Sequence, residues 1–316
     1  MPNPSRLIIA AAALFASAVP GLNAAAQSAP YTVTESGRSF IRLQDAINAI
    51  GSGIGTIRIA PGRFADCGVQ QDGDIRFAAT APGQSVFDGA TCEGKAALVL
   101  RGRSAAVDGL VFANLRVPDG NGAGIRLERG DLTVSQSWFR DSEEGILTAA
   151  DPSGTITIDK TTFTRLGRCD RGLSCAHSIY TANYGQLTVT RSRFEAGRGG
   201  HYLKTHATRV RIEGNSFDDS AGEATNYMID LSVGSAGRIA GNWMVQGRDK
   251  ENYSAFITVA PEGHNNSAEG LVIEGNDARF APGVSRDSAF VADWSGDRLA
   301  IGANALGAGL KRFERR

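Results

Sequence analysis

A short hydrophobic phrase recurs along the chain, and its spacing constrains the fold more than any other feature. In each copy an apolar residue is followed, five positions later, by phenylalanine or another apolar residue. The copies begin at Ile59, Val107, Val134, Ile158, Val189, Ile212, Ile239, Ile273 and Ile301. From Val107 onward successive copies start 23 to 34 residues apart. A loose period of this kind predicts one supersecondary unit per repeat, with insertions of variable length between units.

The residues inside each repeat indicate strands rather than helices. Residues 199–217, for example, contain an alternating run over 202–206 and a second short strand-like run over 210–212, separated by turn residues. Alternation with period two is the signal of a half-buried strand. Two or three strands per repeat predict a β-solenoid, in which each unit becomes stable by stacking on its neighbours.

A polar ladder supports this register. Three positions after each later apolar start lies a serine, threonine or asparagine. These residues are Ser137, Thr161, Ser192, Asn215, Asn242, Asn276 and Asn304. Asparagine tolerates the left-handed backbone conformation, and its amide can bond to neighbouring backbone groups. We therefore predict that the ladder residues stack at one bend of the solenoid.

Over roughly residues 38 to 306 the chain resembles the right-handed parallel β-helix proteins of the pectin-lyase-like superfamily. Residues 39–64 look like the opening of that group. Ser39 is expected to cap a helix that Gly51 ends. The apolar face of this helix comprises Phe40, Leu43, Ala46, Ile47 and Ile50. The resemblance implies an all-β, single-stranded right-handed parallel β-helix with an N-terminal capping helix over its open end. This scaffold hosts lyases, hydrolases, esterases, epimerases and non-enzymes, so it does not fix the reaction.

The chain ends suggest export. Arg6, the apolar run over 7–19 and three alanines at 24–26 predict a signal peptide over residues 1–26. A retained membrane anchor is the alternative interpretation. We assign 27–52 to a leader and the capping helix, 53–306 to the β-helix and 307–316 to a C-terminal tail. The expected location is the periplasm or the extracellular medium.

Four cysteines fit an oxidising compartment and favour two disulfides. Cys67 and Cys92 are 25 residues apart, about one coil, and could be stacked neighbours. Cys169 and Cys175 bracket a short insertion and could staple it. The connectivity stays open. A metal site is the weaker interpretation because no CxxC motif is present, and we expect no metal and no cofactor.

The formal net charge of zero argues against nucleic acid as a partner. A long β-helix presents an extended surface, which suits a polymer. We therefore expect a polysaccharide partner, an acidic one in the leading interpretation. We also expect a monomer that has no contact with the membrane once the signal is removed.

Strand parity predicts where chemistry could lie. If Ile125, Ile179 and Leu203 point inward with their equivalents, the next residue of each coil points outward. This outward column reads Arg126, Leu147, Tyr180, Lys204, Asp230 and Thr258. His206 lies two positions beyond Lys204. Just before the strands of neighbouring coils lie His177, His201 and Tyr227. His201 shares the parity of Leu203, however, and could be a buried turn residue.

We select two sets of candidate residues on this basis. The catalytic candidates are Lys204, His201, His206, Asp230, Tyr227 and Tyr180. The substrate-binding candidates are Tyr202, Arg126, His177, Glu251 and Tyr253. Weaker candidates are Glu143 and Glu144, expected on a groove rim, and Glu262, expected on a loop beside the cleft. The alternative for Lys204 and Asp230 is a surface ion pair worth about 1 kcal/mol or less.

The leading functional hypothesis is a metal-independent lyase, or a C5-epimerase, acting on an acidic glycan. Such an enzyme needs a base for the proton beside the uronate carboxylate and a group that neutralises that carboxylate. Lys204 could serve as either, and Asp230 could orient it. A glycoside hydrolase that uses Asp230 as a carboxylic acid is one alternative. A non-catalytic protein that binds glycan or supports an envelope assembly is another.

Overall fold

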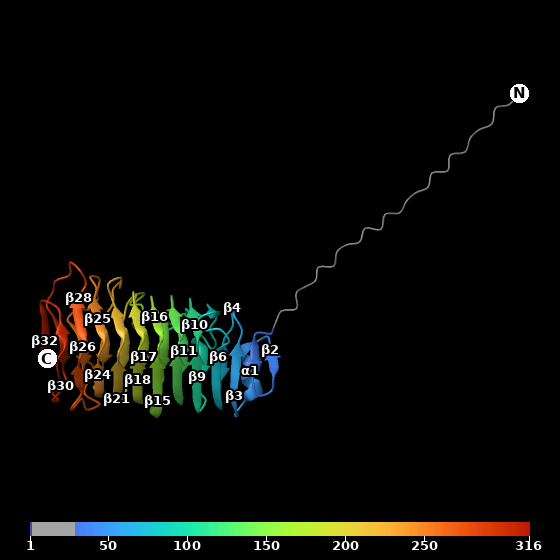
Figure 1. Cartoon of the computed structure of the whole chain (residues 1–316), viewed down its shortest axis with the longest axis horizontal. Coiled ribbons are helices and arrows are strands. Elements are labelled where there is room, and N and C mark those ends of the chain that lie inside the picture. The colour runs from blue at the N-terminus through green and yellow to red at the C-terminus, as the bar shows by residue number, and fades with distance from the viewer. Residues whose placement is uncertain (2–28) are drawn as a thin grey trace.

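The computed structural model describes Met1 and residues 29–316, which form an elongated stack of three long sheets (Figure 1). The sheets contain 12, 10 and 10 strands, and each coil contributes one strand to each sheet in turn. Every pairing is parallel except those of β1, which pairs antiparallel with β2 and β3. The prediction of an all-β parallel β-helix is confirmed.

The strands of the three sheets follow one another regularly along the chain. The first sheet comprises β2 (Arg38–Phe40), β1 (Tyr31–Val33), β3 (Ile54–Ile59), β6 (Asp74–Ala79), β9 (Ser104–Asp108), β12 (Asp131–Ser135), β15 (Asp151–Asp159), β18 (Tyr184–Thr190), β21 (Arg209–Glu213), β24 (Ala236–Ala240), β27 (Val272–Glu274) and β30 (Ala300–Ile301). The second comprises β4 (Gly62–Phe64), β7 (Ser85–Asp88), β10 (Leu110–Ala113), β13 (Trp138–Arg140), β16 (Thr162–Thr164), β19 (Arg193–Glu195), β22 (Ser216–Asp218), β25 (Trp243–Gln246), β28 (Asp277–Phe280) and β31 (Ala305–Leu306). The third comprises β5 (Gly68–Gln70), β8 (Ala96–Leu100), β11 (Ala123–Leu127), β14 (Glu144–Thr148), β17 (Ile179–Thr181), β20 (Leu203–Thr205), β23 (Ile229–Leu231), β26 (Ala255–Val259), β29 (Ser288–Asp293) and β32 (Leu310–Arg315).

The recurring phrase spans the bend between the first and second sheets. Val134, for example, lies in β12 and Phe139 in β13, and both side chains are fully buried. The phenylalanines of successive coils stack inside the solenoid, with ring centroids 4.6 to 5.1 Å apart from Phe112 to Phe217. This spacing matches the separation of neighbouring strands, so each coil buries its apolar residues against the same residues of the next.

The polar ladder forms at this same bend. The Oδ1 atom of Asn242 accepts hydrogen bonds from the backbone and side-chain nitrogens of Asn215, both at 3.0 Å. The left-handed conformation, however, belongs to the residue before the ladder position at every ladder residue except Asn304, as at Arg191 (φ 49°) and Gly214 (φ 65°). The ladder asparagine thus supplies hydrogen bonds, and its predecessor makes the turn.

A single helix, α1 (Leu43–Ile50), lies at the N-terminal end of the described stack (Figure 1). It buries Leu43, Ala46 and Ile47, and Gly51 ends it with φ 60°. Ser39 does not cap it. Ser39 lies in β2, and its hydroxyl pairs with Thr32, whereas the carboxylate of Asp66 accepts the Leu43 N–H at 2.8 Å.

Both disulfides join the pairs that the spacing suggested. Cys67–Cys92 links the segments that precede the neighbouring strands β5 and β8. Cys169–Cys175 closes the short insertion before β17.

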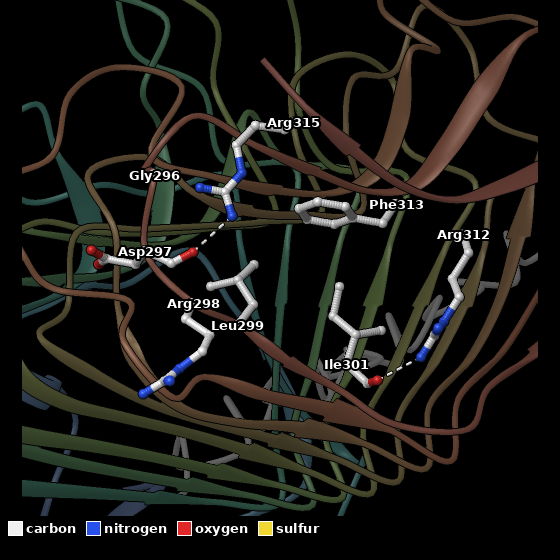
Figure 2. Close-up of a pocket in the computed structure, with 8 residues that line it drawn as sticks. All are labelled: Gly296, Asp297, Arg298, Leu299, Ile301, Arg312, Phe313 and Arg315. Atoms are coloured by element: carbon white, nitrogen blue, oxygen red, sulfur yellow. Dashed lines mark hydrogen bonds between the residues drawn. The ribbon is translucent and has the colours of Figure 1, made fainter.

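The last residues extend the solenoid past the expected boundary at residue 306. β32 pairs with β29, and Phe313 aligns with the inward-facing Val291. Figure 2 shows the pocket at this end, of about 340 Å³. Within it Arg312 donates to the carbonyl of Ile301 at 2.6 Å, and Arg315 donates to that of Asp297 at 2.9 Å. These arginines therefore satisfy carbonyl groups at the open end.

The segment 2–28 lies outside the described residues, and with it nearly all of the expected signal peptide. Within the part of the chain that the structure describes, no helix has the length and apolar character to cross a membrane.

Candidate functional site

The residues of the column predicted from parity align on the third sheet, although Lys204, Asp230 and Thr258 are buried there. Tyr180 in β17 pairs with Lys204 in β20, which pairs with Asp230 in β23. The outer row, as we name this column, comprises Arg126, Leu147, Tyr180, Lys204, Asp230 and Thr258. Parallel pairing in register places one residue from each coil beside the next, about 4.8 Å apart. The outer row therefore gathers an aromatic, a cationic and an acidic side chain on three adjacent strands.

A second row lies at the bend that precedes these strands. The rings of His177 and His201 stack with centroids 5.0 Å apart, and those of His201 and Tyr227 with centroids 5.5 Å apart. The His201 backbone N–H donates to Nδ1 of His177 at 2.9 Å. Glu144 opens β14, one coil before His177. We call Glu144, His177, His201 and Tyr227 the bend row.

The simple parity argument is wrong at this bend. Tyr202 and Leu203 are consecutive residues, yet both belong to the buried core. Two inward residues in succession interrupt the alternation. His201 stacks with His177 and Tyr227 rather than packing beside Leu203, and it is buried at the bend, as the alternative interpretation for it allowed. Tyr202 is only 1% exposed, and its hydroxyl donates to Asp219 at 2.8 Å inside the solenoid. The structure therefore does not bring Tyr202 to the surface with the other candidates.

The side chains of Lys204 and Asp230 do not form the expected ion pair, although the two residues are neighbours in the strand register. The ammonium group of Lys204 contacts the carboxylate of Glu262, which comes from the loop after β26. It also lies 5.4 Å from the centre of the Tyr180 ring. Oε2 of Glu262 is 3.6 Å from Nε2 of His206. This loop folds back over two earlier coils, so the partner of Lys204 comes from 58 residues away in the sequence.

Asp230 is buried behind this layer. Its carboxylate accepts hydrogen bonds from the hydroxyls of Ser232 and Thr258, both at 2.7 Å. Nε2 of His201 lies 3.6 Å from the same carboxylate. Burial raises the pKa of Asp230 above its ordinary value, although the two hydroxyls and Lys204 oppose that shift. Asp230 is thus held by neutral donors and not by a direct lysine contact.

The histidines of this face are held in the neutral form. Burial lowers the pKa of His177 and His201 well below the usual value, and the nearby Lys204 acts in the same direction. The pKa of His206 is also lowered, again mainly by burial. Burial raises the pKa of Tyr180, so its phenol stays protonated. The site therefore combines neutral imidazoles, which can accept a proton, with a phenol that can donate one.

The candidates differ in accessibility. The side chain of His206 is 23% exposed and that of Glu262 is 48% exposed, whereas that of His201 is 10% exposed. A ligand that approaches this face therefore meets Tyr180, His206 and Glu262 first. His177, His201 and Asp230 form a layer beneath them.

Glu144 is a more prominent member of the site than its sequence context indicated. It is 1% exposed, and no side chain among the described residues donates a hydrogen bond to its carboxyl oxygens. Burial raises its pKa well above the ordinary value of 4.5, against the opposing effects of the His177 backbone N–H and of Arg126. Glu143 has a structural role: it accepts the N–H groups of Val117 and Gly122 and pairs with Arg171. The two glutamates are adjacent in the sequence, and they differ in function because only Glu144 lies in register with the bend row.

The remaining substrate-binding candidates lie at the margins. Arg126 is in the outer row, but Leu147 separates it from Tyr180. Glu251 accepts a hydrogen bond at 3.0 Å from Asn226, the residue before Tyr227, and so borders the bend row. Tyr253 is 48% exposed and packs against the guanidinium of Arg286, 4.9 Å from the ring centre.

No family model and no curated protein matches the chain. Among solved structures it is similar to ORF18 of Geobacillus virus E2, with 14% identity and a TM-score of 0.55 over 86% of this chain and 55% of that one. A second structure is the tailspike protein gp49 of the Acinetobacter baumannii bacteriophage Fri1, described as a capsular polysaccharide depolymerase. Its identity is 12% and its TM-score 0.39, over 86% of this chain and 60% of that one. The chain thus spans little more than half of either protein, and the likeness to the first is one of fold.

Proposed function

We propose that the protein is an exported enzyme that cleaves an acidic polysaccharide by β-elimination. The observation that carries this proposal is the cluster of polar side chains at and just beyond the ends of β17 and β20 in the third sheet. There Lys204 supplies a nearly buried cation beneath Glu262, and His206 a neutral imidazole and Tyr180 a protonated phenol, both partly exposed. These are the three chemical functions that elimination at a uronate requires.

The reaction would proceed as follows at a 4-linked uronate. His206 takes the proton from C5, and the C4–C5 double bond forms as the C4–O bond breaks. The departing glycosidic oxygen takes a proton from Tyr180, so no water is consumed. Lys204 neutralises the uronate carboxylate and thereby favours loss of the C5 proton. His201 and Asp230 lie behind Lys204, and Tyr227 continues the bend row toward the next coil. A C5-epimerase would share the proton abstraction and return a proton to the opposite face.

Export and family membership belong to the same proposal. Two disulfides suit an oxidising compartment, as does the signal expected over residues 1–26. The opening segment resembles the pectin-lyase-like superfamily, whose scaffold hosts lyases among other enzymes. We propose periplasmic or secreted location, an acidic glycan as partner and a monomeric enzyme.

The test is incubation of the protein with polygalacturonate, alginate and glycosaminoglycans, followed by the ultraviolet absorbance of unsaturated ends. We expect His206→Gln and Lys204→Ala to lower the rate about 100-fold or more, because each removes one function that acts in the transition state. The matched control is Lys160→Gln, an exposed lysine on the turn between β15 and β16. Absence of new absorbance with every uronate polymer would refute the elimination.

A glycoside hydrolase is the second candidate. The observation that favours it is the presence of raised pKa values at Asp230 and Glu144, since a hydrolase needs a protonated carboxyl as general acid. New reducing ends without ultraviolet absorbance would support this reaction. Glycan binding that Lys204→Ala and His201→Ala leave unchanged, without either product, would instead assign a non-catalytic role.

A further inference from the structure

The loop that carries Glu262 is anchored independently of its carboxylate. The Glu262 N–H donates to the carbonyl of Ser232 at 2.8 Å, and the Asn266 N–H donates to that of Val233 at 2.9 Å. Nδ2 of Asn266 also donates to the carbonyl of His206 at 3.0 Å. The backbone is therefore fixed on both sides of Glu262. Its side chain can rotate away from Lys204 without unfolding the loop.

The two partners of this ion pair are unequally exposed. The side chain of Lys204 is 11% exposed, whereas that of Glu262 is 48% exposed. A carboxylate that leaves the pair returns to water at little cost, but a nearly buried ammonium that loses its partner is expensive. Exchange of one carboxylate for another is thus favoured over simple opening of the pair.

The groups around the Glu262 carboxylate could also bind the carboxylate of another molecule. One oxygen contacts the Lys204 ammonium and the other lies 3.6 Å from Nε2 of His206. Among the described residues that nitrogen has no hydrogen-bond partner. The face of Tyr180 lies beneath the ammonium, with the ring centre 5.4 Å from Nζ of Lys204.

We propose that Glu262 occupies the subsite of a substrate carboxylate and that a uronate displaces it on binding. The inference rests on the proposed function and narrows its substrate class. A neutral glycan cannot replace the charge that Lys204 would lose, so the contact selects for uronates. Glu262 acts as a tethered competitor. The apparent Kd for a uronate therefore equals the intrinsic Kd divided by the fraction of molecules in which Glu262 has left the subsite.

The experiment measures binding separately from turnover. Tetragalacturonate and tetramannuronate are titrated calorimetrically into a His206→Gln variant, in which the proposed proton abstraction is blocked. The comparison is the same variant with Glu262→Gln added. The matched control adds Glu269→Gln instead, since Glu269 is an exposed glutamate on the same connection that pairs with Arg298. Cellotetraose serves as the neutral oligosaccharide, and the melting temperature of each variant reports folding.

We expect Glu262→Gln to tighten binding of at least one oligouronate about tenfold, as for a competitor that is bound nine-tenths of the time. Binding of cellotetraose and the Glu269→Gln control should not change. Unchanged or weaker uronate binding in a folded Glu262→Gln protein would overturn the inference, as would failure of every variant to bind either oligouronate.

In the His206-intact protein, Glu262→Gln should lower KM and leave kcat within about twofold; a large loss of kcat would make Glu262 a catalytic group instead. Tighter binding without any elimination would refute the proposed reaction while the subsite stands.

Discussion

At the scale of single residues, Glu144 should make stability depend on pH. In the unfolded chain its carboxyl loses a proton above about pH 4.5, whereas the buried carboxyl keeps it to a much higher pH. The folded state therefore binds more protons in this window, and stability falls as the pH rises through it by up to about 1.4 kcal/mol per pH unit. Glu144→Gln cannot titrate. We expect the variant to be more stable than the wild type at pH 7 to 8, with the difference shrinking toward pH 4.

Urea unfolding at a series of pH values measures this difference. Glu223→Gln is the matched control, because Glu223 is exposed. A Glu144→Gln variant whose advantage over the wild type does not grow with pH would show that Glu144 is ionised in the folded protein.

At the scale of elements, the ladder should fix the bends between the first and second sheets. Asn242 is 1% exposed; its Nδ2 donates to the carbonyl of Ile212 and to Oδ1 of Asn276, both at 2.9 Å. Its Oδ1 atom satisfies two nitrogens of Asn215. Asn242→Ala leaves these buried groups without partners, each at a cost of about 1 to 3 kcal/mol. We expect a loss of about 3 kcal/mol or more in the free energy of unfolding.

Asn304 provides a comparison within the same ladder. It is partly exposed and bonds to Asn276 on one side only, because it is the last ladder residue. Asn304→Ala should cost clearly less in denaturant unfolding. Equal losses at the two positions would mean that the ladder does not act through buried hydrogen bonds.

At the scale of the whole molecule, Arg312 should protect the C-terminal end of the solenoid. Its guanidinium donates to the carbonyl of Ile301 in the edge strand β30 (Figure 2). It also donates to the carbonyl of Gly302, and the neighbouring Phe313 is 37% exposed. Charged groups at a sheet edge oppose edge-to-edge pairing. We expect Arg312→Ala to associate with increasing concentration, as measured by light scattering on a sizing column.

The control is Arg209→Ala, which removes an exposed arginine from β21, an interior strand of the first sheet. It should stay at the wild-type mass. A monomeric Arg312→Ala protein would show that the exposed end does not need this arginine.

The local pattern of the sequence determined the coil, the stacked phenylalanines and the outer row. Each of these depends on two spacings that can be read from nearby residues: the alternation of side chains within a strand and the number of residues in a coil. Phe139 above Phe163 and Tyr180 beside Lys204 follow from parity and coil length alone. Coil length also placed Cys67 beside Cys92, whereas Cys169 and Cys175 were suggested as a pair because they bracket one short insertion.

Only the tertiary structure decided where that period fails and which distant groups meet. The bend before β20 turns Tyr202 inward and His201 outward, which no alternation rule reveals. Glu262 reaches Lys204 across two coils, and Lys250 forms a buried ion pair with Asp219 at 3.1 Å although the two residues come from different insertions. Insertions carry no period, so their paths depend on the hydrogen bonds that fix them to the assembled coils, and these exist only after the solenoid has formed.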